Sequence, residues 1–254
     1  MVQGVVVTSF IAVSDASKEA FKTATLLKTL SVNSLITGQS GVGKKSIAQY
    51  ILPNAPIIDA LKFDELLSTL KSNSDVIITN LQNSPNLLTL IDTINNNNIR
   101  VVATAKYHLD NEILDDLFSV KFDIPPLVQR EEDVTELISI FCKEASSLFG
   151  VQNELNRESF VADLSNNAHS LKRQVMIAYL LQDIKDTELM AIMEQFLFDK
   201  IGSNSDYRDF LYLYEVPLIK SGLKKFKSQL KLSDKLGLNR NTLRKKIADN
   251  KKYL

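Results

Sequence analysis

The first half of the chain alternates between short apolar runs and longer stretches with helical spacing. β-Branched residues dominate the runs at 35–37, 75–79 and 99–103, and amphipathic stretches separate them. Strands separated by amphipathic helices are typical of a parallel sheet with helices packed on it. We therefore predict an α/β subdomain with a parallel sheet over residues 1–127.

After Pro125-Pro126 only helical spacing continues, which predicts a helical subdomain over residues 128–203. Residues 202–205 are small or polar and predict a hinge before a third domain at 204–254. The helices expected in the second subdomain span residues 130–149, 156–166, 169–184 and 187–201.

The third domain has the pattern of a helix-turn-helix. A short helix over 229–236 is followed by Gly237, which can adopt the left-handed conformation that ends a helix. Asn239 can then cap a second helix. Leu243 and Ile247 are four residues apart in that helix, so we expect them to pack on the first helix and leave the polar side chains outside.

Charge is divided unevenly, although 30 basic and 30 acidic residues give a net charge of zero. Residues 216–254 contain twelve Lys and Arg against Asp234 and Asp249, so this segment carries +10 and the rest of the chain −10. A basic module on an acidic body indicates binding to nucleic acid. Arg can pair with guanine, Asn and Thr can reach base edges, and Lys can neutralise phosphates. The residues predicted to bind DNA are Asn239, Arg240, Asn241, Thr242, Arg244, Lys245 and Lys246.

A glycine-rich segment directly after the first predicted strand fits the first seven positions of a P-loop. It precedes an apolar-periodic helix, which is the context in which backbone N–H groups cradle phosphates and the loop lysine reaches the terminal ones. We expect ATP or ADP there. The predicted nucleotide-binding residues are Gly38, Gln39, Ser40, Gly41, Val42, Gly43, Lys44, Lys45 and Ser46.

The segment from Gly237 to Ile247 closely resembles the C-terminal half of a Fis-type helix-turn-helix, and the resemblance extends over about residues 208–250. It implies that Arg240, Thr242 and Lys245 lie near base edges. It also implies that Asn239, Arg244 and Lys246 mainly contact the DNA backbone. Modules of this kind are two-fold dimers on palindromic sites, so the resemblance implies a homodimer on double-stranded DNA.

The body of the chain resembles the AAA+ domain of sigma-54-dependent activators, a class that ends in a Fis-type module. The resemblance implies an AAA+-like P-loop sheet domain, a helical lid subdomain and an all-α C-terminal module. It places the family's sensor arginine at Arg173, although His169-Ser170-Leu171 stands where the family has Pro-Gly-Asn. The matching segments are 14–16, 38–44, 99–104, 125–127 and the lid start at Arg130, Glu132, Asp133 and Val134.

The departures from that family fall on the catalytic positions. The Asp-Glu pair that ends the second strand of the family, and that handles the metal and the attacking water, is replaced by Thr79-Asn80. Lys106 stands at the sensor asparagine, and Leu114 and Val120 stand at the two arginine fingers. The GAFTGA sequence that grips the sigma factor is absent, and Thr79 follows Lys44 by only 35 positions, too few for its loop.

No metal site is expected. His108 and His169 are far apart with no ligand spacing around them, and Glu131-Glu132-Asp133 is explained as charge that complements a helix dipole. The single cysteine, Cys142, suits a reduced compartment. We find no charge-free apolar run that could cross a bilayer and expect a cytoplasmic, nucleoid-associated protein.

The sequence favours a sequence-specific DNA-binding transcriptional regulator. Its AAA+-like body would serve dimerisation or nucleotide sensing without hydrolysis, so we do not expect an enzyme or a sigma-54 contact. One alternative is an ATP-hydrolysing sigma-54 activator in which Asp59 or Asp75 replaces the lost acids. Another is an architectural protein that bends DNA with little sequence preference.

Overall fold

The computed structural model describes residues 10–109, 112–150, 155, 160–182 and 184–254. The chain forms two compact units, Met1–Asp183 and Ile184–Leu254, which we call the first and the second unit and describe separately. Among the described residues, no helix combines the length and apolar composition needed to span a bilayer.

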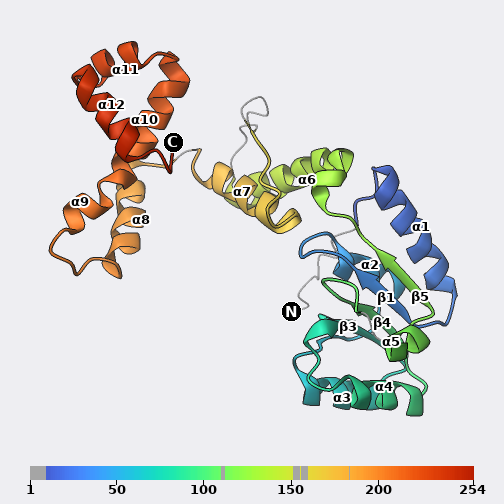
Figure 1. The fold of residues 1–254 in the computed structure, drawn as a ribbon. Coiled ribbons are helices and arrows are strands. Elements are labelled where there is room, and N and C mark those ends of the chain that lie inside the picture. The colour runs from blue at the N-terminus through green and yellow to red at the C-terminus, as the bar shows by residue number, and fades with distance from the viewer. Residues whose placement is uncertain (1–9, 110–111, 151–154, 156–159, 183) are drawn as a thin grey trace. The chain divides into compact units, whose positions relative to one another are not determined.

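A five-stranded parallel sheet forms the centre of the first unit (Figure 1), with the strand order β2-β3-β4-β1-β5. The three central strands match the predicted runs to within one residue. The two edge strands were not predicted, because β2 has only three residues and β5 mixes charged with apolar side chains that stay half-exposed. The strands are β1 (Ser34–Thr37), β2 (Ile57–Asp59), β3 (Asp75–Thr79), β4 (Arg100–Thr104) and β5 (Val120–Asp123).

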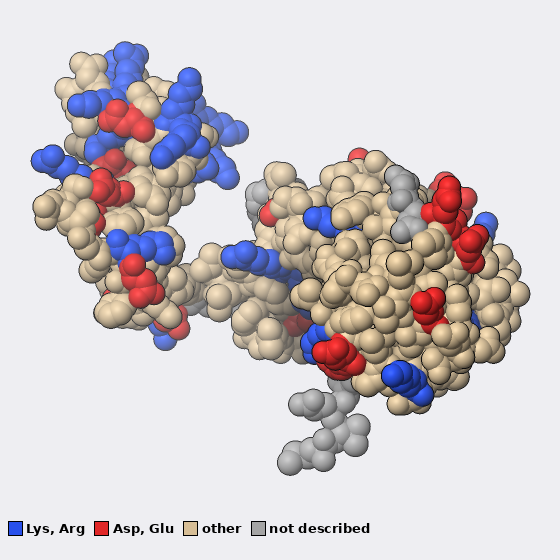
Figure 2. All heavy atoms as spheres, turned by 60° about the horizontal axis from the view of Figure 1, so that its bottom comes forward, with Lys and Arg blue, Asp and Glu red and all other residues tan. Residues whose placement is uncertain are grey.

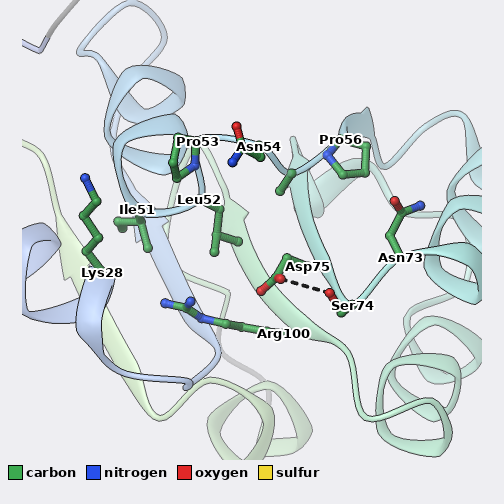
Figure 3. A pocket seen from close by; sticks show the side chains of 11 residues that line it. Lys28, Ile51, Leu52, Pro53, Asn54, Pro56, Asn73, Ser74, Asp75 and Arg100 are labelled. Atoms are coloured by element: carbon green, nitrogen blue, oxygen red, sulfur yellow. Dashed lines mark hydrogen bonds between the residues drawn. The ribbon is translucent and has the colours of Figure 1, made fainter.

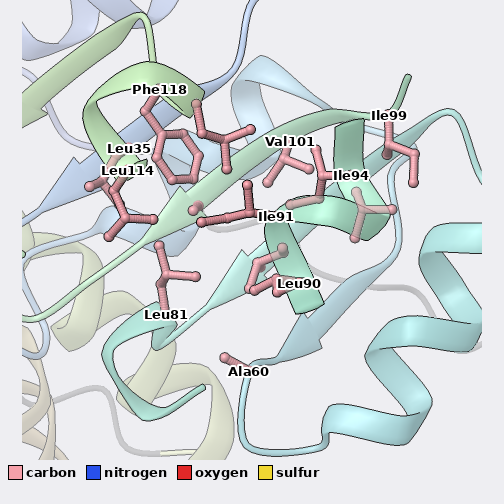
Figure 4. Packing of buried hydrophobic residues seen from close by; sticks show 14 of the residues in the cluster. Leu35, Ala60, Leu81, Leu90, Ile91, Ile94, Ile99, Val101, Leu114 and Phe118 are labelled. Carbon is pink, nitrogen blue, oxygen red and sulfur yellow. The ribbon is translucent and has the colours of Figure 1, made fainter. Parts of the chain in front are cut away.

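Helices cover both faces of this sheet, so its central strands are apolar throughout. In β3, the side chain of Ile77 packs with α1 and α2, while its neighbours Val76 and Ile78 pack with α3, α4 and α5 in the cluster of Figure 4. Successive strand residues thus serve two separate cores. The helices are α1 (Asp15–Thr29), α2 (Lys44–Ile51), α3 (Phe63–Ser72), α4 (Leu87–Asn96) and α5 (Glu112–Leu117), and a short 3-10 helix η1 (Leu81–Asn83) follows β3.

The helical subdomain after the sheet consists mainly of α6 (Glu131–Phe149) and α7 (Ala168–Leu180), preceded by the 3-10 helix η2 (Leu127–Gln129). The helix predicted over 156–166 is wrong for its described part, because residues 160–164 form neither helix nor strand and 165–167 form a turn. Residues 156–159 lie outside the described residues. Phe160, Ala162 and Leu164 alternate with polar or exposed residues and pack on the α6–α7 core. This two-residue period is that of an extended chain.

The second unit is entirely helical, and it includes the helix that we predicted over 187–201 as part of the preceding subdomain. Its core packs Ile219 of α10, Leu232 of α11 and Leu243 of α12 together. The turn between the last two helices uses Gly237 at φ +63°, as predicted. The helices are α8 (Asp186–Phe198), α9 (Asp206–Phe210), α10 (Tyr212–Phe226), α11 (Gln229–Lys235) and α12 (Arg240–Asp249).

Candidate nucleotide-binding and nucleic-acid-binding sites

The glycine-rich loop joins β1 to α2 at the edge of the sheet where the parallel strands end. Gly38 has a φ of +137°, and a Cβ there would lie 2.5 Å from the carbonyl oxygen of Ile124, so β5 approaches the loop too closely for any other residue. Gly41 has a φ of +78° and is similarly close to the backbone oxygen of Asn166. The glycines therefore fix a tight loop at the N-terminus of α2.

The backbone amides of this loop are free to bind a ligand. Within the described part of the chain, none of the N–H groups of residues 39–46 donates a hydrogen bond. Consecutive free N–H groups at a helix N-terminus attract anions, because the helix dipole adds positive potential there. The geometry of the predicted nucleotide-binding loop is thus suited to an anion.

Lys44 is the first residue of α2, and its ammonium donates hydrogen bonds to the carbonyl oxygens of Gly38 and Gln39 within the loop. Burial lowers the pKa of Lys44 to about 8; the carboxylate of Asp123 opposes this shift, and the positive charge of Lys106 adds to it. The loop lysine therefore lies among groups of both charges, supplied by β5 and by the end of β4.

The lid contacts the carbonyl side of the loop. The buried side chain of Asn167, just before α7, donates to the carbonyl of Ser40 at 2.9 Å and to the side chain of Gln39 at 3.1 Å. Its oxygen accepts from the N–H of Leu127 at 2.8 Å. The next residue, Ala168, donates its N–H to the carbonyl of Gly41 at 3.2 Å. These bonds leave the loop N–H groups free.

Arg173, the predicted sensor arginine, is exposed on α7 and makes no hydrogen bond or ion pair with the described residues of the loop. The α7 side chain that packs against the loop is that of His169, one turn earlier. A Cβ on Gly41 would lie 3.0 Å from the ring of His169. The assignment of Arg173 as the sensor arginine therefore stays a prediction that rests on the resemblance alone.

Two polar residues end β3, at the positions where the family that the sequence resembles has an Asp-Glu pair. The hydroxyl of Thr79 donates to the carbonyl of Ile58, and the amide of Asn80 donates to Asp59 at 2.6 Å. Asp59 ends β2, which lies three strands away from β1, or roughly 14 Å across the sheet. The side chains of Thr79 and Asn80 are therefore engaged with β2, the edge strand on the other side of β3 from the loop.

Asp75 lies at the opposite edge of the sheet from the loop. It starts β3 and lines a hollow of about 430 Å³ together with Lys28 and Arg100 (Figure 3), where it accepts a hydrogen bond from Ser74. Arg100 donates from Nη2 to the carbonyl of Leu27 and so caps the C-terminus of α1. Asp75 therefore cannot act on phosphates held by the loop.

The acid nearest the loop is one that the sequence did not single out. Asp123 ends β5, directly beside the end of β1, and accepts a hydrogen bond from the hydroxyl of Thr37 at 3.1 Å. The edge strand that carries it has no clear apolar pattern, so nothing in the sequence placed it there. The two arginine-finger positions are structural, because Leu114 is buried in the core and Val120 pairs with β1.

The predicted DNA-binding residues cluster on the outer faces of α12. Asn239 caps the helix by accepting from the N–H of Asn241 at 2.9 Å, and Leu243 is buried. Lys246 differs from the others, because it is half-buried and forms an ion pair with Glu215 of α10. The exposed members are Asn239, Arg240, Asn241, Thr242, Arg244 and Lys245.

Basic side chains gather over the second unit in Figure 2. The three helices α10–α12 supply most of them, whereas the visible face of the first unit carries scattered charges of both signs. This distribution agrees with the uneven division of charge along the sequence. In this view the second unit therefore presents a concentrated positive surface.

The comparisons with solved structures identify the fold. NtrX from Brucella abortus in complex with ADP superimposes with a TM-score of 0.62 and 15% identity, over 97% of this chain and 69% of that one. Its ATP complex gives a TM-score of 0.57 and 14% identity, over 94% and 68% of the two chains. The fold is AAA+-like. The sequence matches no protein-family model and no curated protein.

Proposed function

We propose that the protein is a sequence-specific DNA-binding transcriptional regulator whose AAA+-like unit binds ATP or ADP without hydrolysing it. The observation that carries this proposal is the exposed basic face of α12, built on the shared core of α10, α11 and α12. A helix of this kind fits the major groove with its N-terminal residues against base edges.

The side chains of α12 divide by their surroundings into two groups. Arg240, Asn241 and Thr242 lie exposed in the first turn, where they can read base edges. Arg244 is exposed one turn later and can bind a phosphate. Lys246 is already paired with Glu215, so we assign it to holding α12 on α10 and no longer to the DNA backbone.

The proposal also includes a homodimer that forms through α8. None of the residues of α8 is buried, and the helix is rich in large apolar side chains that water would otherwise cover. A symmetric dimer would bury this surface, and because α8 belongs to the same unit as α12, it would also place two reading helices for a palindromic site. The exposed apolar residues are Leu189, Met190, Ile192, Phe196, Phe198 and Ile201.

The absence of hydrolysis follows from the end of β3. Thr79 and Asn80 cannot hold a metal as a carboxylate does or activate water, and their side chains are engaged with β2. The loop keeps its amide cradle and its lysine. Binding without turnover is what this combination supports.

The test is selection of genomic DNA fragments by the purified full chain, followed by footprinting at about 50 mM and about 200 mM salt. We expect footprints confined to a few palindromic sites, binding that weakens steeply with salt, and a sedimenting mass twice 28.5 kDa. Salt-sensitive binding with no sequence preference would instead support an architectural protein. Steady-state ATP turnover that is lost in Lys44→Ala would overturn the non-hydrolysing part of the proposal.

The lowered pKa of Lys44 predicts a pH profile for nucleotide binding. Below a pKa of about 8 the ammonium is charged and attracts phosphate, so affinity for ATP should fall as the pH rises beyond that value. Bound phosphate stabilises the charged form of Lys44, so the pKa of Lys44 is higher in the complex than in the free protein. Titrations between about pH 7 and about pH 9.5 measure this effect. Lys44→Gln should bind weakly at every pH, and a wild-type profile equally flat would contradict the assignment.

A further inference from the structure

The end of β3 and the start of α2 do not fit a magnesium ion. P-loop hydrolases hold Mg²⁺ with the hydroxyl that follows the loop lysine and with an acid at the end of another strand of the sheet. Here Lys45 follows Lys44, and Thr79 and Asn80 take the place of the acids. Magnesium requires oxygen ligands, of which carboxylates are the most common. An ammonium group at the position of a metal ligand repels the metal.

We find no substitute for these magnesium ligands among the described residues. In the described part of the chain, no three His, Cys, Asp or Glu side chains come together as a metal site. Asp123 is the carboxylate that acts on the charge of Lys44, and it lies on the β5 side of the loop, opposite β4 and β3. The place of the missing ligands on the β3 side therefore has the hydroxyl of Thr79 and the amide of Asn80 but no carboxylate.

Two lysines, Lys45 and Lys106, stand where related sequences would have uncharged polar residues. Lys45 is exposed in the first turn of α2 and forms no ion pair with any described residue. Lys106 follows the end of β4, the strand paired with β1, and its charge reaches Lys44. It is exposed and has no ion-pair partner among the described residues either. Lys44 and Lys45 therefore begin the helix that follows the loop, and the charge of Lys106 reaches Lys44 from the end of β4.

We propose that this site binds the nucleotide's polyphosphate as a metal-free anion, with Lys45 and Lys106 supplying the positive charge that Mg²⁺ supplies in hydrolysing relatives. This inference rests on the nucleotide-binding part of the proposed function. Two ammonium groups neutralise phosphate oxygens without polarising a bond for attack by water. Magnesium added to the solution withdraws the free anion from the site and so competes with the protein.

The experiment is calorimetric titration of the full chain with ATP, once in EDTA and once in excess MgCl₂ at matched ionic strength. We expect the affinity for ATP to be roughly tenfold higher in EDTA than in MgCl₂. This difference corresponds to about 1.4 kcal/mol of binding free energy. Binding that requires Mg²⁺ overturns the inference and leaves nucleotide binding intact. No binding under either condition overturns both.

Two matched variants test whether Lys45 itself contributes to ATP binding or whether any lost positive charge has the same effect. Lys45→Thr should weaken binding of free ATP by roughly three- to tenfold, because an exposed charge contact is lost. Lys71→Thr removes an equally exposed lysine from α3 and should leave the affinity unchanged. The triple variant Lys45→Thr, Thr79→Asp, Asn80→Glu restores oxygen ligands and should reverse the preference in favour of MgATP. An equal loss of ATP affinity in Lys45→Thr and Lys71→Thr would contradict the role of Lys45. Circular dichroism checks that each variant is folded.

Discussion

Asp133→Asn should lower the free energy of unfolding of the first unit by about 3–5 kcal/mol, because it leaves a buried guanidinium without its counterion. Arg130 is 2% exposed and donates from Nε to Asp133 at 2.7 Å. The same carboxylate accepts the backbone N–H groups of Val13 and Ser14 at the start of α1. The change therefore disturbs the lid and α1 together. Urea denaturation followed by far-ultraviolet circular dichroism measures it, since the chain contains no tryptophan.

Glu132→Gln is the matched control, because Glu132 lies in the same helical turn as Asp133 but is exposed. It should change the free energy of unfolding by less than about 0.5 kcal/mol. Equal effects of the two substitutions would show that Asp133 contributes only to the helix dipole, as the sequence had suggested.

The pH dependence of stability provides an independent check on Asp133. Burial acts to raise the pKa of this carboxyl, but hydrogen bonds from Ser14, Arg130, Val13 and Ser17 together lower it below its ordinary value. The stabilisation is therefore complete above the unfolded pKa of about 3.9 and is lost as the pH falls through the folded-state pKa. Asp133→Asn should remove this acid-sensitive part of the stability curve. An unchanged curve below about pH 4 would exclude the assignment.

Arg240→Ala should weaken binding to the specific site by about 1–3 kcal/mol and relax base preference at one position, if the guanidinium pairs with guanine. Non-specific binding should change much less. Competition titrations of specific against random duplexes at fixed salt measure both quantities.

Arg244→Ala is the comparison variant for DNA binding, since Arg244 is equally exposed on the same helix but lies one turn later. Loss of a phosphate contact should weaken all duplexes alike and reduce the slope of log affinity against log salt by about 1. If Arg240→Ala also weakens all duplexes alike, Arg240 contacts only the backbone and the specificity must come from Asn241 or Thr242.

The sequence predicted the central sheet, the phosphate loop and the helix-turn-helix, because each depends on local patterns. Buried parallel strands are apolar on both faces, and glycines mark positions of positive φ. The edge strand with Asp123 was missed, because half-exposed strands have mixed composition. The positions of His169 and Lys246 were also missed, since both depend on contacts between distant segments: the lid with the loop, and α12 with α10.

The bonds from Asn167 and Ala168 to the loop carbonyls have a thermodynamic consequence for the ligand. A glycine-rich loop is flexible when free, and a ligand that orders it must overcome the lost conformational entropy. Here the lid already holds two backbone carbonyls of the loop, those of Ser40 and Gly41, and the side-chain oxygen of Gln39. The loop is therefore already ordered on its carbonyl side, and a ligand bound by its N–H groups would cost little loop entropy.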